Sequence, residues 1–190
     1  MGLVAMSYGR MTRLGDSAFE KMEKVNSELL AMTYGALVTA MIKDFQDVKI
    51  VNEELEKMGY NIGVRLIDEF LAKSGITQCR NLKDTAHYIA KVGFKMFLGI
   101  NAEVSWSSNP RQFSIEFKGN PLIEFVELPE QFKDLDYSNI LCGVLRGALY
   151  SVQMVVTTKL CRSELKGDPI SEIEVMLKEV VAEKVKSDDD

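Results

Sequence analysis

The sequence predicts a mixed α/β (α+β) fold in which helices pack on an antiparallel four-stranded sheet. Two observations support this prediction. Apolar residues recur every three or four positions over much of residues 27–98 and again over 137–154, which is typical of helices with one buried face. Apolar and polar residues alternate over 112–117 and 173–177, which is typical of strands with one buried face. We therefore expect three helices, two strands, one inserted helix and two further strands.

Three helices are expected first. Residues Ser27–Phe45 place apolar side chains along one helical face. The second helix is expected to start with Asn52 as its N-cap, because two glutamates follow it, and to end at Gly75. The third should run from the N-cap Asn81 to about Leu98, before Gly99.

The second half of the chain supplies the sheet. The segment "QFSIEF" predicts one strand, and the preceding "EVSWSSNPR" predicts its partner and the connecting turn. The segment "YSNILCGVLRGALYSVQM" returns to helical spacing and predicts a largely buried helix. Two further strands, "VVTTKL" and "IEVML", flank "KGDP", whose glycine and aspartate favour a hairpin turn.

Length and composition indicate one globular domain. A chain of 190 residues with 46% hydrophobic and 27% charged residues can bury a sufficient core without a disulfide or metal. We expect a flexible N-terminal extension over residues 1–26, a single domain over 27–181 and an acidic C-terminal tail over 182–190. The formal charge of −5 argues against binding of nucleic acid.

The chain is expected to act in the cytoplasm. Its first residues lack the charged start and apolar core of a secretory signal, and its longest apolar run is too short to cross a bilayer. The 3 cysteines include no C-x-x-C pair, so neither a disulfide framework nor a zinc site is expected.

Catalytic motifs are not found in the sequence. There is no phosphate-binding loop, no dinucleotide fingerprint and no H-E-x-x-H. The sequence has a single histidine, His87. It lies on the polar edge of the third helix with Asp84, Lys91 and Lys95, and we interpret it as a surface residue. Arg146, inside the apolar fourth helix, is expected to form a structural ion pair.

Cys79 differs from the other two cysteines. Cys142 and Cys161 lie in an apolar helix and a strand, where a thiol is usually inert. Cys79 precedes a helix start and adjoins Arg80, and both the helix dipole and the cation would lower the pKa of its thiol. Behind it, small or apolar residues share one helical face: Leu82, Ala86, Ala90 and Gly93. This strip allows either close packing of a neighbouring helix or an apolar channel with a nucleophile at its mouth.

Several long segments carry a family resemblance. "MTYGALVTAMIKDF", "KMGYNIGVRLIDEFLAKS", "CRNLKDTAHYIAKVGFKMFLGI", "NPLIEFVELPE" and "YSNILCGVLRGAL" are similar, in order and spacing, to the Bet-three core subunits of the TRAPP vesicle-tethering complex. The resemblance covers about residues 27–178. It does not extend to residues 1–26 or to the acidic end.

The resemblance implies specific chemistry at Cys79. In that family the matching cysteine holds a long-chain acyl group, such as palmitate, as a thioester inside a hydrophobic channel. Leu82, Ala86, Ala90 and Gly93 would line that channel. Independently of the resemblance, Arg80 beside Cys79 and Lys95 on the same helix are expected to activate the thiol, because a nearby cation lowers its pKa. No metal is implied. Gly93 replaces the family's usual alanine, which keeps the position small, whereas Tyr150 replaces a common glutamate and leaves any contact of that carboxylate in doubt.

The resemblance also implies partners. The chain would pair with other TRAPP subunits through its helices, or with itself when isolated, in a complex that lies peripherally on the cis-Golgi and endoplasmic reticulum membranes. That complex catalyses guanine-nucleotide exchange on a Rab GTPase in transport between endoplasmic reticulum and Golgi, and the single subunit is not an enzyme. The tail residues Asp188, Asp189 and Asp190 would lie close to the GTPase, although the composition of the tail by itself favours a solubilising role.

Two other functions are compatible with the residues. A soluble carrier or sensor of a hydrophobic small molecule would also use a buried channel beside a thiol. A thiol acyltransferase would need a general base near Cys79, and His87, eight residues away on the polar edge, is poorly placed for that role.

Overall fold

A computed structural model gives the fold, and it describes residues 8–77 and 81–181. The helices, in chain order, are α1 (Tyr8–Lys21), α2 (Ser27–Phe45), α3 (Val48–Ser74), α4 (Leu82–Tyr88), the π-helix η1 (Ile89–Gly93), α5 (Phe94–Leu98), the 3-10 helix η2 (Glu130–Phe132), α6 (Asn139–Ser151) and the 3-10 helix η3 (Glu164–Lys166). The strands are β1 (Ala102–Trp106), β2 (Gln112–Phe117), β3 (Met154–Arg162) and β4 (Ser171–Val180).

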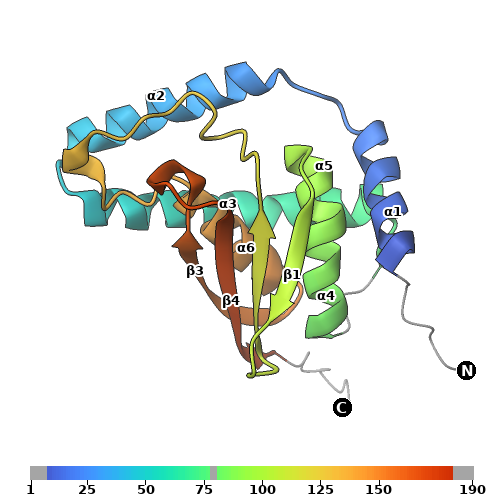
Figure 1. Ribbon diagram of the computed structural model, residues 1–190. Coiled ribbons are helices and arrows are strands. Elements are labelled where there is room, and N and C mark those ends of the chain that lie inside the picture. The colour runs from blue at the N-terminus through green and yellow to red at the C-terminus, as the bar shows by residue number, and fades with distance from the viewer. Residues whose placement is uncertain (1–7, 78–80, 182–190) are drawn as a thin grey trace, which may run out of the picture.

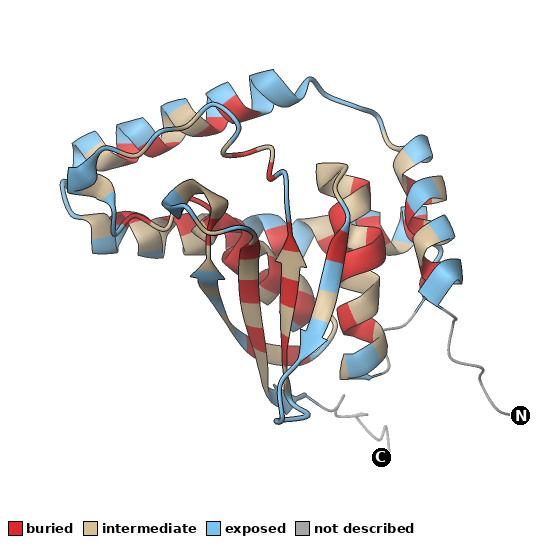
Figure 2. Cartoon of the chain, in the orientation of Figure 1, coloured by how far each residue is buried: buried red, intermediate tan, exposed pale blue. Residues whose placement is uncertain are grey.

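The strands form one antiparallel sheet in the order β1-β2-β4-β3. One face of this sheet packs against the helices, and α6 lies across it (Figure 1). Buried and more exposed residues alternate along β2 and β4, as Figure 2 shows. Phe113 pairs with Val175 and Ile115 with Ile173, and all four side chains are buried in the main core. The predicted combination of helices and a four-stranded antiparallel sheet is therefore confirmed.

Local signals placed most element ends correctly. The predicted helix Ser27–Phe45 and the predicted strand Gln112–Phe117 are both confirmed. Asn81 is the N-cap of α4, where its side chain accepts a hydrogen bond of 2.8 Å from the backbone nitrogen of Asp84. Gly75 and Gly99 end their helices with φ angles of 71° and 72°, which glycine adopts without a steric penalty.

The predicted start of the second helix is wrong. Asp47 is the N-cap of α3, and its side chain accepts a hydrogen bond of 2.8 Å from the backbone nitrogen of Lys49. Asn52 lies one turn inside the helix and fastens the chain segment before α6 instead. Its side chain donates to the carbonyl of Asp134 at 3.2 Å and accepts from the backbone nitrogen of Asp136 at 2.8 Å. Asn52 is therefore of a residue type that often caps helices, but here its side chain makes a tertiary contact.

Residues 1–26 were expected to form a flexible extension. The structure corrects this expectation for the part of them that it describes. Residues 8–21 form the helix α1, which packs beside α4, η1 and α5 (Figure 1). Met11, Gly15 and Ala18 are its buried residues. Ala18 belongs to a second apolar cluster together with Ile67, Phe70, Ile76, Val92 and Met96. Residues 1–7 and the acidic tail 182–190 lie outside the described residues.

Candidate functional site

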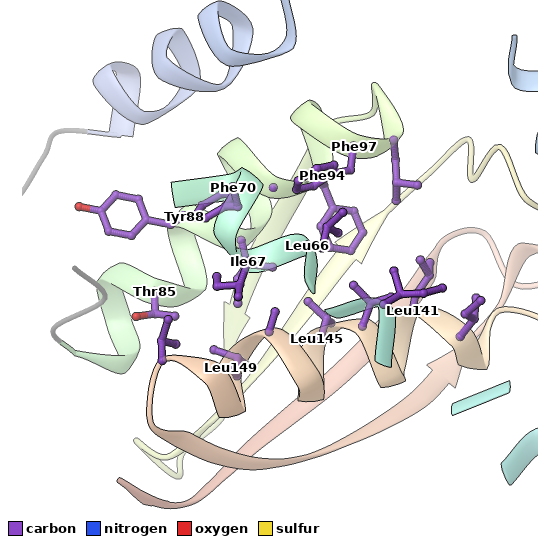
Figure 3. A pocket seen from close by; sticks show the side chains of 18 of the residues that line it. Leu66, Ile67, Phe70, Thr85, Tyr88, Phe94, Phe97, Leu141, Leu145 and Leu149 are labelled. Atoms are coloured by element: carbon purple, nitrogen blue, oxygen red, sulfur yellow. The ribbon is translucent and has the colours of Figure 1, made fainter. Parts of the chain in front are cut away.

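An apolar cavity of about 400 Å³ lies between α3, the α4–η1–α5 segment and α6 (Figure 3). α3 contributes Ile62, Leu66, Ile67 and Phe70; α4, η1 and α5 contribute Thr85, Tyr88, Ile89, Gly93, Phe94, Phe97 and Leu98; α6 and the residue after it contribute Ile140, Leu141, Val144, Leu145, Ala148, Leu149 and Val152. Val25, Leu30 and Leu122 complete the lining. Among the described residues that line it, none has a charged side chain.

The two ends of the cavity differ in exposure. At one end Thr85 and Leu149 are each 2% exposed and Phe70 is 7% exposed. At the other end Val25 is 73% exposed, Leu30 36% and Ile62 41%. We call these last three residues the mouth. The cavity therefore reaches from a closed end beside the first turn of α4 to a mouth under the start of α2.

Glycines bring α3 and α6, which both contribute side chains to the cavity lining, into backbone contact. A Cβ atom at Gly59 or Gly63 would lie 2.0 or 2.1 Å from a carbonyl oxygen of α6. A Cβ atom at Gly143 or Gly147 would lie 1.9 or 2.1 Å from a carbonyl oxygen of α3. Real Cβ atoms do not approach other atoms so closely, so only glycine fits at these positions. We call these four glycines the glycine seam.

The opposite wall is the α4–η1–α5 segment, and a π-helix interrupts it. The sequence predicted one continuous α-helix from Asn81 to Leu98, but residues 89–93 form a π-helical turn. A π-turn contains extra backbone, so it changes which residues share a helical face. Ile89 and Gly93 face the cavity from this turn, and Lys91 and Val92 are buried in the direction of α1.

The structure places the four predicted channel-lining residues in two different environments. Gly93 lines the cavity, and a Cβ atom there would meet Phe70 at no less than 3.8 Å. Ala86 and Ala90 are fully buried but belong to the main core, and Leu82 packs against that core. Thr85, Tyr88 and Ile89, which the sequence analysis did not single out, line the cavity instead. In the facing wall, Ile62, Leu66 and Phe70 recur at a spacing of four residues, and this apolar spacing is the sequence signal for that wall.

A polar cluster fastens α1 to this second wall. The side chain of Lys91 is 6% exposed and forms an ion pair with Glu103 of β1. The Tyr8 hydroxyl donates a hydrogen bond to the other carboxylate oxygen of Glu103, and the Lys91 ammonium lies 4.5 Å from the centre of the Tyr8 ring. Below this cluster, Gly15 of α1 sits directly against the carbonyl of Lys91. We call Tyr8, Lys91 and Glu103 the α1 clasp.

The clasp perturbs two titratable groups. Burial alone would raise the pKa of Glu103, but hydrogen bonds from Lys91 and Tyr8 and the charge of Lys91 together lower it. Burial and the charges of Lys83 and Lys91 lower the pKa of His87, although Asp84 and Glu103 oppose this. His87 is half-buried, and its ring meets the Tyr8 ring edge-on at 6.1 Å. The expectation of a plain surface histidine is therefore wrong.

Cys79 and Arg80 lie outside the described residues, and they directly precede Asn81, the N-cap of α4. The Thr85 hydroxyl, at the closed end of the cavity, donates a hydrogen bond of 2.7 Å to the Asn81 carbonyl. Lys95, the other predicted activating cation, faces α1, where its ammonium lies 3.9 Å from Asp16 and 5.3 Å from the centre of the Phe19 ring.

The other two cysteines and Arg146 lie away from the cavity lining. Burial raises the pKa of the Cys142 thiol, and burial together with Glu174 and Glu172 raises that of Cys161, so both thiols stay protonated. Arg146 forms the predicted ion pair, with its Nε 2.9 Å from a carboxylate oxygen of Glu56.

Tyr150 is exposed, and its ring lies 6.0 Å from that of Tyr60. Within residues 8–77 and 81–181, no group of three or more acidic, histidine or cysteine residues could hold a metal ion. In the same part of the chain, no helix combines the length and apolar character needed to span a bilayer.

Comparison with known proteins identifies relatives along most of the chain. Residues 30–176 match the family model described as transport protein particle (TRAPP) component. Trafficking protein particle complex subunit 3 of Dictyostelium discoideum is 57% identical over 175 residues, which cover 91% of this chain and 94% of the relative. Transport protein particle subunit bet3 of Schizosaccharomyces pombe is 45% identical over 181 residues, which cover 94% of this chain and 98% of the relative.

A solved structure shares the fold at high identity. The crystal structure of a trafficking protein particle complex subunit 3 from Naegleria fowleri, covalently bound to palmitic acid, aligns with a TM-score of 0.81 and 59% sequence identity. The alignment covers 85% of this chain and 100% of that one.

Proposed function

This chain belongs to the family of transport protein particle (TRAPP) components, and on that premise we propose that it is a core subunit that stores a fatty acyl chain, bound to Cys79 as a thioester, in the cavity. The subunit by itself turns over no substrate. Within its complex it serves vesicle tethering between the endoplasmic reticulum and the Golgi and contributes to nucleotide exchange on a Rab GTPase.

The observation that best supports acyl binding is the cavity itself. Its volume of about 400 Å³ falls within the range of about 300–1,000 Å³ of ligand pockets, and its apolar lining suits a hydrocarbon chain. Its closed end lies beside the first turn of α4, whose N-cap Asn81 follows Cys79 by two residues. The Naegleria fowleri relative is covalently bound to palmitic acid. Burying such a chain at about 0.8 kcal/mol per methylene would contribute on the order of 10 kcal/mol.

The surface of α2 supports pairing with another subunit. Between Glu28 and Lys43 the helix has no charged residue, although Leu29 is 65% and Met32 is 69% exposed. An exposed, uncharged helical face of this kind is typical of a protein–protein interface. We propose that another TRAPP subunit covers it, or a second copy of the chain when the subunit is isolated. The complex, and not the single chain, would then associate with the Golgi membrane.

Activation of Cys79 is proposed to depend mainly on Arg80. Arg80 adjoins Cys79 in sequence, whereas the Lys95 ammonium is already close to Asp16. A neighbouring cation lowers the pKa of a thiol and increases its thiolate fraction at neutral pH. Arg80→Glu should therefore slow acylation about tenfold, and Lys95→Glu should slow it less, in a time course followed by intact mass. Equal rates in wild type and both variants would exclude this electrostatic contribution.

The acidic tail is proposed to act in nucleotide exchange. Asp188, Asp189 and Asp190 could repel nucleotide phosphates or compete for their magnesium and lysine partners. Removal of residues 182–190 should lower the exchange rate of a reconstituted complex without changing its assembly. If the truncated complex exchanges nucleotide as fast as wild type at matched ionic strength, the tail serves solubility alone.

One experiment tests the main proposal. The chain is isolated from a eukaryotic host by affinity capture, and the intact mass and co-purifying proteins are determined before and after hydroxylamine treatment. A mass increase equal to a fatty acyl group, lost with hydroxylamine and absent from Cys79→Ser, together with co-purifying subunits, is expected. An unmodified mass in both eukaryotic and bacterial hosts would overturn the acyl assignment.

The half-open cavity favours a second candidate, a soluble carrier of a hydrophobic molecule. A carrier needs a path through which its ligand can leave, and the exposed mouth provides one. In the same experiment a carrier would yield an extractable lipid without hydroxylamine and no co-purifying subunits.

A further inference from the structure

The helix α1 covers one side of the α4–η1–α5 segment (Figure 1). We infer that this side is a docking site for an amphipathic helix of a partner protein, one with a stripe of small residues and an acidic side chain, and that α1 occupies the site as a detachable cover. The residues under α1 are Lys91, Val92, Lys95 and Met96, which we call the α1 seat, and none of them lines the cavity. The inference therefore goes beyond the acyl proposal and does not depend on it.

The rest of the domain has a main core that does not include α1. Among the described residues, no member of α1 belongs to the main core cluster or packs against it. Ala18 of α1 belongs to the second, smaller cluster, together with Val92 and Met96 of the seat. Residues 23–26, which join α1 to α2, are all exposed. Because few apolar contacts hold this terminal helix, α1 can leave its seat while the main core stays closed.

The apolar contact between α1 and its seat is narrow. Met11, Gly15 and Ala18 are the buried residues of α1, and their spacing of four and three residues places them along one helical face. A Cβ atom at Gly15 would lie 2.1 Å from the carbonyl oxygen of Lys91, so the two backbones touch at this point. Stabilisation by burial grows with apolar area, and glycine and alanine add little of it. A helix must present a small residue here to fit the seat.

A cation beside this stripe favours an acidic helix. The ammonium of Lys95 lies 3.9 Å from a carboxylate oxygen of Asp16 and 5.3 Å from the centre of the Phe19 ring. The side chain of Asp16 is 54% exposed, so water and salt weaken this ion pair. When α1 detaches, Lys95 loses this carboxylate. The apolar side chains of Val92 and Met96, which are 0% and 2% exposed under α1, then meet water unless another helix replaces α1.

The cover and a partner helix would compete for the seat. A tethered helix has an effective concentration on the order of millimolar, so α1 stays bound even though its contact is small. A free helix reaches only those molecules from which α1 has detached, and its apparent affinity is reduced by that fraction. A substitution that unseats α1 and leaves the seat intact should therefore strengthen the binding of a free helix.

The test uses the full-length chain and a fluorescein-labelled synthetic peptide of residues 8–24 as the free helix, with binding followed by fluorescence anisotropy. Gly15→Leu in the chain prevents its own α1 from seating, because the added side chain meets the Lys91 carbonyl. This variant should bind the peptide at least about tenfold more tightly than wild type does. Gly9→Leu is the matched control and should bind like wild type, because a Cβ atom at Gly9 meets nothing within 4 Å.

Two further measurements address the charge of the seat. Acetic anhydride should label Lys95 about tenfold faster in Gly15→Leu than in wild type, whereas labelling of Lys57, whose side chain is already 70% exposed, should not change. A peptide with Asp16→Lys should bind the Gly15→Leu chain more weakly than a peptide with Glu20→Lys. Asp16 faces Lys95, whereas Glu20 is an exposed acidic residue of the same helix.

Each outcome supports or overturns the inference. Equal affinity of the peptide for the wild-type and Gly15→Leu chains would show that α1 does not compete for the seat. Equal binding of the two charge-reversed peptides would remove the argument for an acidic helix. If the Gly15→Leu chain binds vesicles of phosphatidylcholine and phosphatidylserine but not the peptide, the surface binds lipid and the helix proposal is wrong. If Gly15→Leu fails to fold, Asp16→Lys in the chain weakens the seating of α1 without a steric clash and repeats the test.

Discussion

The two long walls of the cavity are held in place in different ways. The α3–α6 wall relies on the glycine seam, where the backbones touch and no side chain intervenes. The α4–α5 wall contains a π-helical turn and is backed by α1 through the clasp and Gly15. Backbone contact allows almost no adjustment, whereas side-chain contacts and an ion pair can rearrange. The comparison indicates that any opening of the cavity would use the α4–α5 wall.

Breaking the seam should have the largest effect. In Gly147→Ala the new methyl group would overlap the Tyr60 carbonyl, 2.1 Å away, so α3 and α6 must separate. We expect the free energy of unfolding of the acyl-free protein to fall by about 3 kcal/mol, as in overpacked cores, measured by urea denaturation.

Gly9→Ala is the matched control for the seam. Gly9 is also helical, but a Cβ atom there would meet nothing within 4 Å. Its free energy of unfolding should stay constant or rise by up to about 1 kcal/mol, because alanine favours helix. Equal effects of the two substitutions would show that the seam is not tightly packed.

Loosening the clasp should have an intermediate effect. Glu103→Gln leaves the buried Lys91 ammonium without its counter-charge, and we expect a loss of about 2 kcal/mol of unfolding free energy. Protection from hydrogen exchange should fall in α1 and η1 but not in α3 or α6. Glu116→Gln on the same sheet is the control, because Arg162 keeps its ion pair with Glu172. Uniform loss of protection in all helices would contradict the distinction between the walls.

Filling the cavity from the α4–α5 wall should have a smaller effect on stability but a clear effect on the ligand. Gly93→Leu places its side chain where an acyl chain would run, and a Cβ atom at this position makes only ordinary contacts. The acyl-free protein should gain about 1 kcal/mol, because the cavity is partly filled. Intact mass should show little or no acyl group. Full acylation of this variant would mean that the chain lies elsewhere.

Acidification should have the smallest effect and should act mainly through His87, whose ring contacts the Tyr8 ring of the clasp. The pKa of His87 is lowered in the folded state, so the unfolded state binds more protons once the pH falls below about 6.5, and stability then decreases. The lowered pKa of Glu103 adds a loss only below about pH 4.3. Between pH 7 and 5 wild type should lose less than about 1 kcal/mol relative to His87→Gln, since His87 is partly solvated. Parallel pH profiles would exclude His87 as the source.

Much of the fold and part of the site could be predicted because their signals are local. Asn81 starts α4 through its own side chain, and Gly75 and Gly99 end their helices through their own backbone angles, whatever packs around them. The alternation in Gln112–Phe117 needs only one buried face. Gly93 lines the cavity whereas Ala90 belongs to the main core, and a strict α-helical period, which the sequence suggests, does not hold across the π-turn that contains both residues.

The sequence by itself determined most helices between residues 27 and 154, the antiparallel strands and the family, because periodicity, capping residues and long characteristic segments are properties of the chain alone. Only the tertiary structure decided that residues 8–21 form a packed helix, that Asn52 fastens a distant segment, and that Lys91 is buried in an ion pair with Glu103. It also decided which helical faces surround the cavity. These features depend on contacts between residues far apart in sequence, and such contacts leave no local pattern from which they could be read.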